Sequence, residues 1–196
     1  MRLDRRWIQE HIPHQGGMCL LDEVLSWDMT QTQCRSSTHR SAENPLRADS
    51  RLGAACGIEY AAQTMAVHGA LIASAAGAVA PSGFLASVRG VRLNVDRLDV
   101  FEGDLVTSVE RVAGDESTAL YEFSVSADDV VLVSGRAAIA FNVFAGVARS
   151  ADGAAAAAPT SRAGDASEAA AGAGDAAVDI GNGALDTATV ENRGTL

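Results

Sequence analysis

The sequence contains no lysine, since all 15 basic residues of the 196-residue chain are arginine. A catalytic Schiff base and a Walker-type phosphate loop both require a lysine amine, so these two enzyme classes are excluded. The only glycine-rich stretch of that kind, Gly172-Ala-Gly174, is not placed between a predicted strand and a predicted helix. We therefore expect no nucleotide or other cofactor.

Cysteine is scarce, and no pair has the Cys-x-x-Cys spacing of a redox or zinc motif. The cysteines are Cys19, Cys34 and Cys56. Reduced, packed thiols are the simplest interpretation, which is typical of a cytoplasmic protein. His11 and His14 could join Cys19 as metal ligands, but Pro13 and the predicted loop make this signal weak, so no metal site is expected.

Long hydrophobic runs are also missing. The N-terminus, Met1-Arg-Leu-Asp-Arg-Arg-Trp-Ile8, lacks the apolar run of a signal peptide. Residues 64–82 are uncharged, yet Ala and Gly dominate them, whereas a membrane span requires more Leu, Ile, Val and Phe. We expect a soluble, cytoplasmic protein without a membrane partner.

Aromatic residues are absent after residue 150. Residues 151–196 contain 16 Ala, 7 Gly and seven acidic side chains against two Arg, a net charge of −5 within a total of −10. Such a composition buries too little apolar area to offset chain entropy. The sequence therefore predicts one domain over residues 1–146 and a disordered Ala/Gly-rich acidic tail over 147–196. With an acidic balance in both parts, no nucleic-acid partner is expected.

One carboxylate stands out against this apolar background. Glu59 is the only charged residue between Arg51 and Arg89, in a stretch that predicts a helix from about Leu52 to Ala76, ending before Gly77. A helix that is apolar nearly all round is buried. Burial raises the pKa of a carboxyl group toward the range useful for acid–base chemistry, so Glu59 is the first candidate catalytic residue.

The remaining pattern predicts a short helix and several strands around that central helix. Residues 4–11 predict the short helix, and the strands are expected at 18–28, 32–39, 83–95, 105–112, 119–127 and 130–144. The last four are expected to form an antiparallel meander. One long helix wrapped by one curved sheet is the simplest α+β packing of these elements.

Three motifs resemble the hotdog-fold dehydratases that act on 3-hydroxyacyl thioesters of acyl carrier protein. The motifs are Ile12-Pro-His-Gln-Gly-Gly-Met-Cys-Leu-Leu-Asp-Glu-Val-Leu25, Glu59-Tyr-Ala-Ala-Gln63, and Phe84-Leu-Ala-Ser-Val-Arg-Gly-Val-Arg-Leu93 followed by Gly103-Asp104. The phrase from Asn44 to Gly69 is most similar to dehydratases of aryl-polyene clusters. The resemblance implies the hotdog fold, and a dimer whose sites are formed by both chains.

The resemblance has one departure, at the catalytic histidine. Housekeeping dehydratases place it fourteen residues before the helix glutamate, where this sequence has Pro45. His39, twenty residues before Glu59, is the nearest upstream histidine and our first candidate for the base, since histidine titrates near neutral pH. His14 is the alternative, although the family keeps a histidine there for structure. Glu59 is expected to act as the acid.

Other residues are candidates for binding the substrate. Gln63, one helical turn after Glu59, could orient that carboxylate or the substrate. The amides of residues 54–57, among them Cys56 and Gly57, are candidate donors to the thioester oxygen at a helix N-terminus. Arg89 could contact phosphopantetheine or the acidic carrier protein.

These motifs favour dehydration of carrier-bound 3-hydroxyacyl thioesters, in fatty-acid-like or aryl-polyene biosynthesis. Acyl carrier protein is the expected partner, with a homodimer or a heterodimer with another hotdog subunit. Two alternatives stay open, namely a hotdog acyl-thioesterase in which Glu59 activates water, and a non-catalytic subunit that binds acyl carrier protein or a partner hotdog protein.

Overall fold

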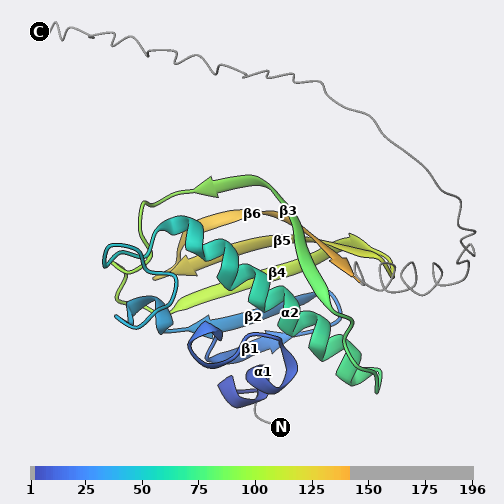
Figure 1. Ribbon diagram of the computed structural model, residues 1–196. Coiled ribbons are helices and arrows are strands. Elements are labelled where there is room, and N and C mark those ends of the chain that lie inside the picture. The colour runs from blue at the N-terminus through green and yellow to red at the C-terminus, as the bar shows by residue number, and fades with distance from the viewer. Residues whose placement is uncertain (1–2, 142–196) are drawn as a thin grey trace, which may run out of the picture. The chain divides into compact units, whose positions relative to one another are not determined.

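The computed structural model describes residues 3–141, which form a six-stranded antiparallel sheet, one short helix and one long helix (Figure 1). The helices are α1 (Arg5–His11) and α2 (Gly57–Ala75). The strands are β1 (Glu23–Trp27), β2 (Gln31–Ser36), β3 (Gly83–Leu93), β4 (Leu105–Gly114), β5 (Thr118–Ala127) and β6 (Val130–Phe141). The helix α2 lies along one face of the sheet and contacts β2, β4 and β5. The predicted tail, residues 147–196, lies outside the described residues.

The strand order is β1-β2-β4-β5-β6-β3, which confirms the six strands but corrects the predicted meander of four. β4, β5 and β6 follow one another as expected, whereas β3 pairs with β6 at the far edge. The connection after β3 crosses the start of α2, where Ala54 N donates to Asp96 O and Leu98 N donates to Leu52 O. The chain then enters β4, which is separated from β3 in the sheet by β5 and β6.

The same connection explains why α2 begins later than predicted. Leu52 is engaged with the crossing segment, and residues 54–56 form one turn of 3₁₀ helix before α2 starts at Gly57. The other end agrees with the prediction. Gly77 adopts a left-handed backbone (φ +67°), and Ala78 N donates to Ala73 O at 2.8 Å, so the last turn is closed by a glycine cap.

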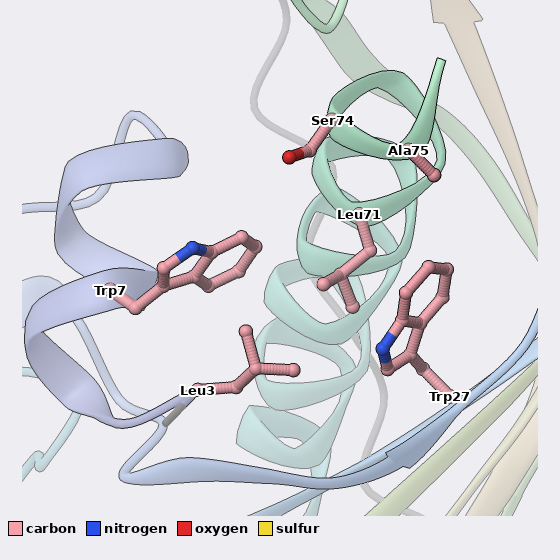
Figure 2. A pocket seen from close by; sticks show the side chains of 6 residues that line it. All are labelled: Leu3, Trp7, Trp27, Leu71, Ser74 and Ala75. Carbon is pink, nitrogen blue, oxygen red and sulfur yellow. The ribbon is translucent and has the colours of Figure 1, made fainter. Parts of the chain in front are cut away.

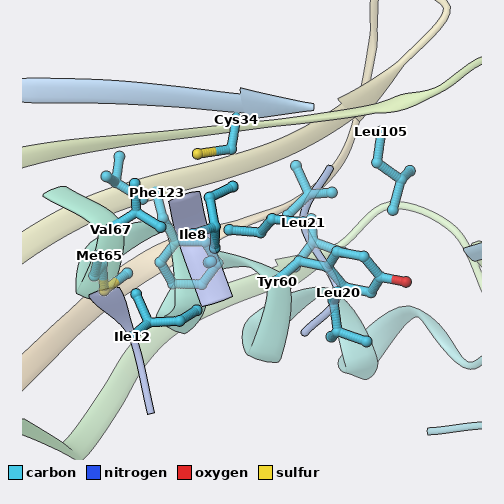
Figure 3. Packing of buried hydrophobic residues seen from close by; sticks show 14 of the residues in the cluster. Ile8, Ile12, Leu20, Leu21, Cys34, Tyr60, Met65, Val67, Leu105 and Phe123 are labelled. Carbon is cyan, nitrogen blue, oxygen red and sulfur yellow. The ribbon is translucent and has the colours of Figure 1, made fainter. Parts of the chain in front are cut away.

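The core lies between α2 and the concave face of the sheet and is continued by α1 (Figure 3). Side chains along β5 alternate between the core and solvent, since Tyr121, Phe123 and Val125 are buried while Leu120 and Glu122 are exposed. Each large apolar side chain that is fully buried contributes about 1.5–3 kcal/mol. α2 supplies much of this core, as its apolar sequence predicts. In the described part of the chain, no helix combines the length and apolarity that a membrane span requires.

Candidate active site

Glu59 lies in the first turn of α2, at the end of the helix where the core opens toward solvent. Its Oε1 atom is 3.2 Å from Nε2 of His14 and accepts a hydrogen bond of 2.9 Å from Nε2 of Gln63. Both side chains are partly accessible, with 29% of the His14 side chain and 31% of the Glu59 side chain exposed. The structure therefore places an imidazole, a carboxylate and an amide together at an accessible position.

The segment after α1 brings His14 to this position. α1 ends at His11, before Pro13, and Gln15 then donates from Nε2 to Gln9 O (2.6 Å) and Ile12 O (3.2 Å). A tight turn follows at Gly16, whose positive φ of +56° is costly for any residue with a Cβ atom. This turn directs the chain back along α2.

Gln63 fixes the returning segment against α2. Its Oε1 accepts from Leu20 N at 2.8 Å, while its Nε2 donates to Met18 O at 2.8 Å and to Glu59. The side chain is fully buried, so losing any of these bonds would leave an unpaired polar group in the core. The predicted role of Gln63 in orienting Glu59 agrees with these contacts.

The sequence predicted a raised pKa for the Glu59 carboxyl group, and this direction is wrong. Burial by itself would raise the pKa of this carboxyl group, but the hydrogen bonds from His14 and Gln63 outweigh burial and hold the pKa below its usual range. Glu59 is therefore ionised at neutral pH. Its Oε1 atom accepts a hydrogen bond from Nε2 of His14, whose Nδ1 atom is buried and has no hydrogen-bond partner among residues 3–141.

His39, the predicted base, occupies a different environment. Its side chain is fully buried, and Nε2 lies 3.1 Å from Phe101 O in the crossing connection. Burial lowers the pKa of His39, which favours a neutral ring that donates to this carbonyl. The structure does not bring His39 to Glu59. Since the ring is closed off from solvent, it has no access to a substrate bound beside that carboxylate.

The predicted oxyanion donors are largely engaged in local bonds. Ala54 N donates to Asp96 O, Cys56 N to Gly53 O, and Gly57 N to the carbonyls of the preceding 3₁₀ turn. Gly57 is buried against β6, where a Cβ atom would lie 3.0 Å from Val133 Cγ2. The glycine at this position therefore serves helix–sheet packing.

Arg89 lies far from this cluster in the sheet, on the exposed edge strand β3. It is directly opposite Arg136 of β6, which is itself paired with Glu122. Arg89 is thus a surface cation, as a contact with an anionic partner requires.

The chain matches one known family over most of the described residues. The model of the ApeP-like family, described as ApeP dehydratase, matches residues 6–146 and includes both His14 and Glu59. The chain belongs to the ApeP-like dehydratase family. A search of curated proteins gives no match.

The solved ApeI:P structure shows the hotdog fold for this ApeP-like chain. The dehydratase heterocomplex ApeI:P from Xenorhabdus doucetiae is similar with a TM-score of 0.65 and 22% identity, over 74% of this chain and 97% of that chain. The putative thioesterase from Shewanella oneidensis has a TM-score of 0.49 and 12% identity, over 70% and 93% of the two chains. The PaaI protein of E. coli has a TM-score of 0.45 and 9% identity, over 60% and 80%.

The sequence favoured His39 over His14 because His39 precedes an irregular loop near the start of the helix. It contained one signal for His14 that was given less weight, namely its place in the first dehydratase-like motif, before Met18 and Leu20, whose backbone Gln63 binds. The sequence analysis also gave no role to Asn44 or Tyr60, whose polar groups meet behind Glu59.

A groove of about 260 Å³ lies at the opposite end of α2, and its lining is mainly apolar (Figure 2). Trp7 of α1 and Trp27 of β1 flank Leu71, with Leu3, Ser74 and Ala75 completing the lining. Leu71 is 12 residues beyond Glu59, about 18 Å along a helix that rises 1.5 Å per residue. The groove contains no acid or base and is separate from the His14–Glu59 pair.

Among residues 3–141, no group of three His, Cys, Asp or Glu side chains is arranged to hold a metal ion.

Proposed function

We propose that this chain dehydrates 3-hydroxyacyl thioesters of acyl carrier protein to trans-2-enoyl thioesters, with His14 and Glu59 as the acid–base pair. The contact between His14 Nε2 and Glu59 Oε1, at an accessible position in a dehydratase-family fold, is the observation that supports it. The pathway we propose is fatty-acid-like or aryl-polyene biosynthesis, in the cytoplasm.

The proposed reaction requires one proton to be removed and one to be supplied. The pair takes the C2 proton, the C2=C3 double bond forms, and the C3–O bond breaks as the hydroxyl group leaves with a proton from the pair as water. His14 and Glu59 share a hydrogen bond, so the proton gained by one group can be returned through the other. A single proton then cycles within the pair, and the pair is restored at each turnover.

The pair suits this exchange because both members can carry a proton and they lie in direct contact. Glu59 is ionised because His14 and Gln63 donate to it, and the imidazole of His14 is a second group that can take up or release a proton. A positioned acid–base group of this kind contributes about 10²- to 10⁴-fold to the rate.

The proposed partners are acyl carrier protein and a second hotdog subunit. The similar ApeI:P structure is a dehydratase heterocomplex, which supports assembly of this chain with another hotdog subunit. A second copy of this chain is the other proposed partner. Arg89 on the exposed edge strand is the proposed contact for phosphopantetheine or the acidic carrier.

The test is a dehydration and hydration assay that follows the enoyl thioester by mass, on the purified protein and on its proposed subunit complexes. We expect His14→Gln and Glu59→Gln to lower the rate about 10²-fold or more, because Gln keeps the size and hydrogen-bonding capacity but does not exchange a proton. His39→Gln is the matched control, since its amide can still donate to Phe101 O.

The outcomes separate the alternatives. A large loss with His39→Gln, together with an active His14→Gln, would restore His39 as the base. Release of free acid and thiol by the wild type would indicate a thioesterase. No turnover by a folded protein on several carrier-bound substrates, alone or with a partner subunit, would indicate a non-catalytic binding subunit.

A further inference from the structure

A cluster of buried polar groups surrounds the hydroxyl group of Tyr60, next to Glu59 of the His14–Glu59 pair in the sequence of α2. The hydroxyl group of Tyr60, the residue after Glu59, accepts a hydrogen bond of 2.9 Å from Asn44 Nδ2 and lies 2.9 Å from Thr38 Oγ1. Tyr60 is fully buried and Asn44 is 6% exposed. Burial raises the pKa of Tyr60, so the phenol stays neutral and retains its proton. None of these groups takes part in the proposed proton transfer.

The hydrogen bonds of this cluster run in one direction. Asn44 Nδ2 can only donate, so Thr38 Oγ1 is the acceptor for the Tyr60 hydroxyl in this cluster. Thr38 Oγ1 in turn donates to Leu20 O at 2.8 Å, a carbonyl that also accepts from Ser36 Oγ. The backbone amide of Leu20 donates to Gln63 Oε1. Gln63 Nε2 in turn donates to Glu59 Oε1.

The result is a connected series of contacts from Asn44 to the carboxylate. Asn44 donates to Tyr60, Tyr60 to Thr38, Thr38 to the carbonyl of Leu20, and the amide of Leu20 to Gln63, which holds Glu59. Satisfied networks of this type are rigid, because each group loses its partner when any member moves.

Arg47 anchors the loop that carries Asn44. Its guanidinium group donates to His39 O at 3.1 Å and to Ser41 O at 2.7 Å, and pairs with the buried carboxylate of Asp99 at 2.9 Å. The loop is thereby tied to the crossing connection. The phrase Asn44-Pro-Leu-Arg47 thus combines a residue that holds Tyr60 with one that holds the loop.

We infer that Tyr60 is a positioning residue for the His14–Glu59 pair. Its hydroxyl group, held by Asn44, fixes the segment around Leu20, and through Gln63 this segment sets the orientation of the Glu59 carboxylate. The inference rests on the proposed function, because it assigns the role of Tyr60 to the rate of that reaction.

The molecule offers a matched control in Tyr121. This second buried tyrosine donates no bond toward the pair; its hydroxyl lies 3.1 Å from Nδ1 of His68, which α2 carries in its other half. Tyr60→Phe and Tyr121→Phe each delete one buried hydroxyl, which costs about 1–3 kcal/mol of stability by leaving a partner unsatisfied. A purely structural role predicts the same consequences for both variants.

The positioning role predicts a difference between the variants in kinetics. We expect Tyr60→Phe to lower kcat about tenfold with KM changed less than about twofold, since small misplacements of a reacting group reduce the chemical step. We expect Tyr121→Phe to retain the wild-type kcat at a temperature where both variants are folded. Thr38→Val should reproduce the kinetic loss, whereas Thr38→Ser, which keeps the hydroxyl group, should restore the rate.

A second measurement does not depend on activity. The ring ¹H–¹³C resonances of His14, followed by NMR, should shift in Tyr60→Phe but stay in place in Tyr121→Phe. Equal kcat for the two tyrosine variants with unmoved His14 resonances would overturn the inference. If the wild type lacks dehydratase activity, the proposed function fails, and the His14 resonances alone then decide whether Tyr60 positions that residue.

Discussion

The two halves of α2 carry similar polar groups with different consequences. In the first half, Tyr60 and Gln63 are buried, and their hydrogen bonds lead to Glu59 and His14 at an accessible position. In the second half, His68 lies between Tyr121 and Asp28 O, with both ring nitrogens within 3.1 Å of a partner, and the side chains of His68 and Tyr121 are both buried. A buried polar network becomes a candidate site where one end of it reaches solvent.

The comparison also separates the histidines. His68 and His39 each bond a backbone carbonyl and are fully buried, so the neutral ring serves to satisfy the core. His14 instead meets a carboxylate and remains partly exposed. Among histidines that share one chain, the partner and the exposure distinguish a structural imidazole from a candidate catalytic one.

The largest effect is expected from removing the hydrogen bonds of Gln63, in the first half of α2. Gln63→Leu has a similar volume but removes the bonds to Glu59, Met18 O and Leu20 N, and leaves buried backbone groups unpaired. We expect a loss of about 2–4 kcal/mol in the free energy of unfolding and a fall in kcat of about tenfold or more. Denaturant unfolding and the dehydration assay measure the two effects.

The neighbouring residue provides the control. Thr64 is buried like Gln63, but its hydroxyl group donates to Tyr60 O within α2 and contacts the Cys34 thiol rather than Glu59. Thr64→Val should cost about 1 kcal/mol or less and leave kcat unchanged. A Gln63→Leu variant that keeps the wild-type rate while Thr64→Val loses it would contradict the assignment of Gln63 to the pair.

A smaller effect on stability is expected from the titration of the two buried histidines, His39 and His68. Burial lowers the pKa of His39 and of His68 below the value of about 6.5 that an unfolded chain has, so the unfolded state binds protons first. The stability from the neutral rings is complete above pH 6.5 and is lost as the pH falls toward the folded-state pKa values. Each histidine contributes at most about 1.4 kcal/mol per pH unit in this window.

The measurement is the melting temperature between pH 8 and pH 5, with His68→Gln alongside the wild type. The amide of Gln can donate to Asp28 O and accept from Tyr121 without titrating, so the variant should have a flatter pH profile. Glu59 does not interfere, because its lowered pKa places its loss of stability below this range. If the pH profile of His68→Gln equals that of the wild type, His68 takes up no proton on unfolding and the prediction is wrong.

Local patterns in the sequence were sufficient for the elements and for the acidic member of the pair. The isolation of Glu59 and the i,i+4 spacing to Gln63 predict a helix carrying both side chains on one face, and the structure places them 2.9 Å apart. Gly77 predicts the end of the same helix. These features depend on residues close in the chain.

Features that depend on distant pairing could not be predicted in this way. The place of β3 beside β6 follows from the path of the crossing connection over α2, and no local pattern specifies it. The choice between His14 and His39 has the same origin, because the turn at Gly16 and the contacts of Gln63 bring one of them to Glu59. The lowered pKa of Glu59 follows from that choice, since burial without a partner would have raised it.

The smallest effect is expected outside the described domain. The Ala/Gly-rich composition of residues 151–196 predicts that deleting residues 150–196 leaves the melting temperature within about 1–2 °C of the wild type and kcat unchanged, because such a segment adds little apolar burial. The matched control is a deletion that begins at residue 136 and removes the second half of β6, which pairs with both β3 and β5. That variant should lose its cooperative melting transition, because Ala137 and the pairing of two neighbouring strands are removed from the core. If the shorter deletion also abolishes the transition, the tail belongs to the folded unit and the boundary near residue 146 is misplaced.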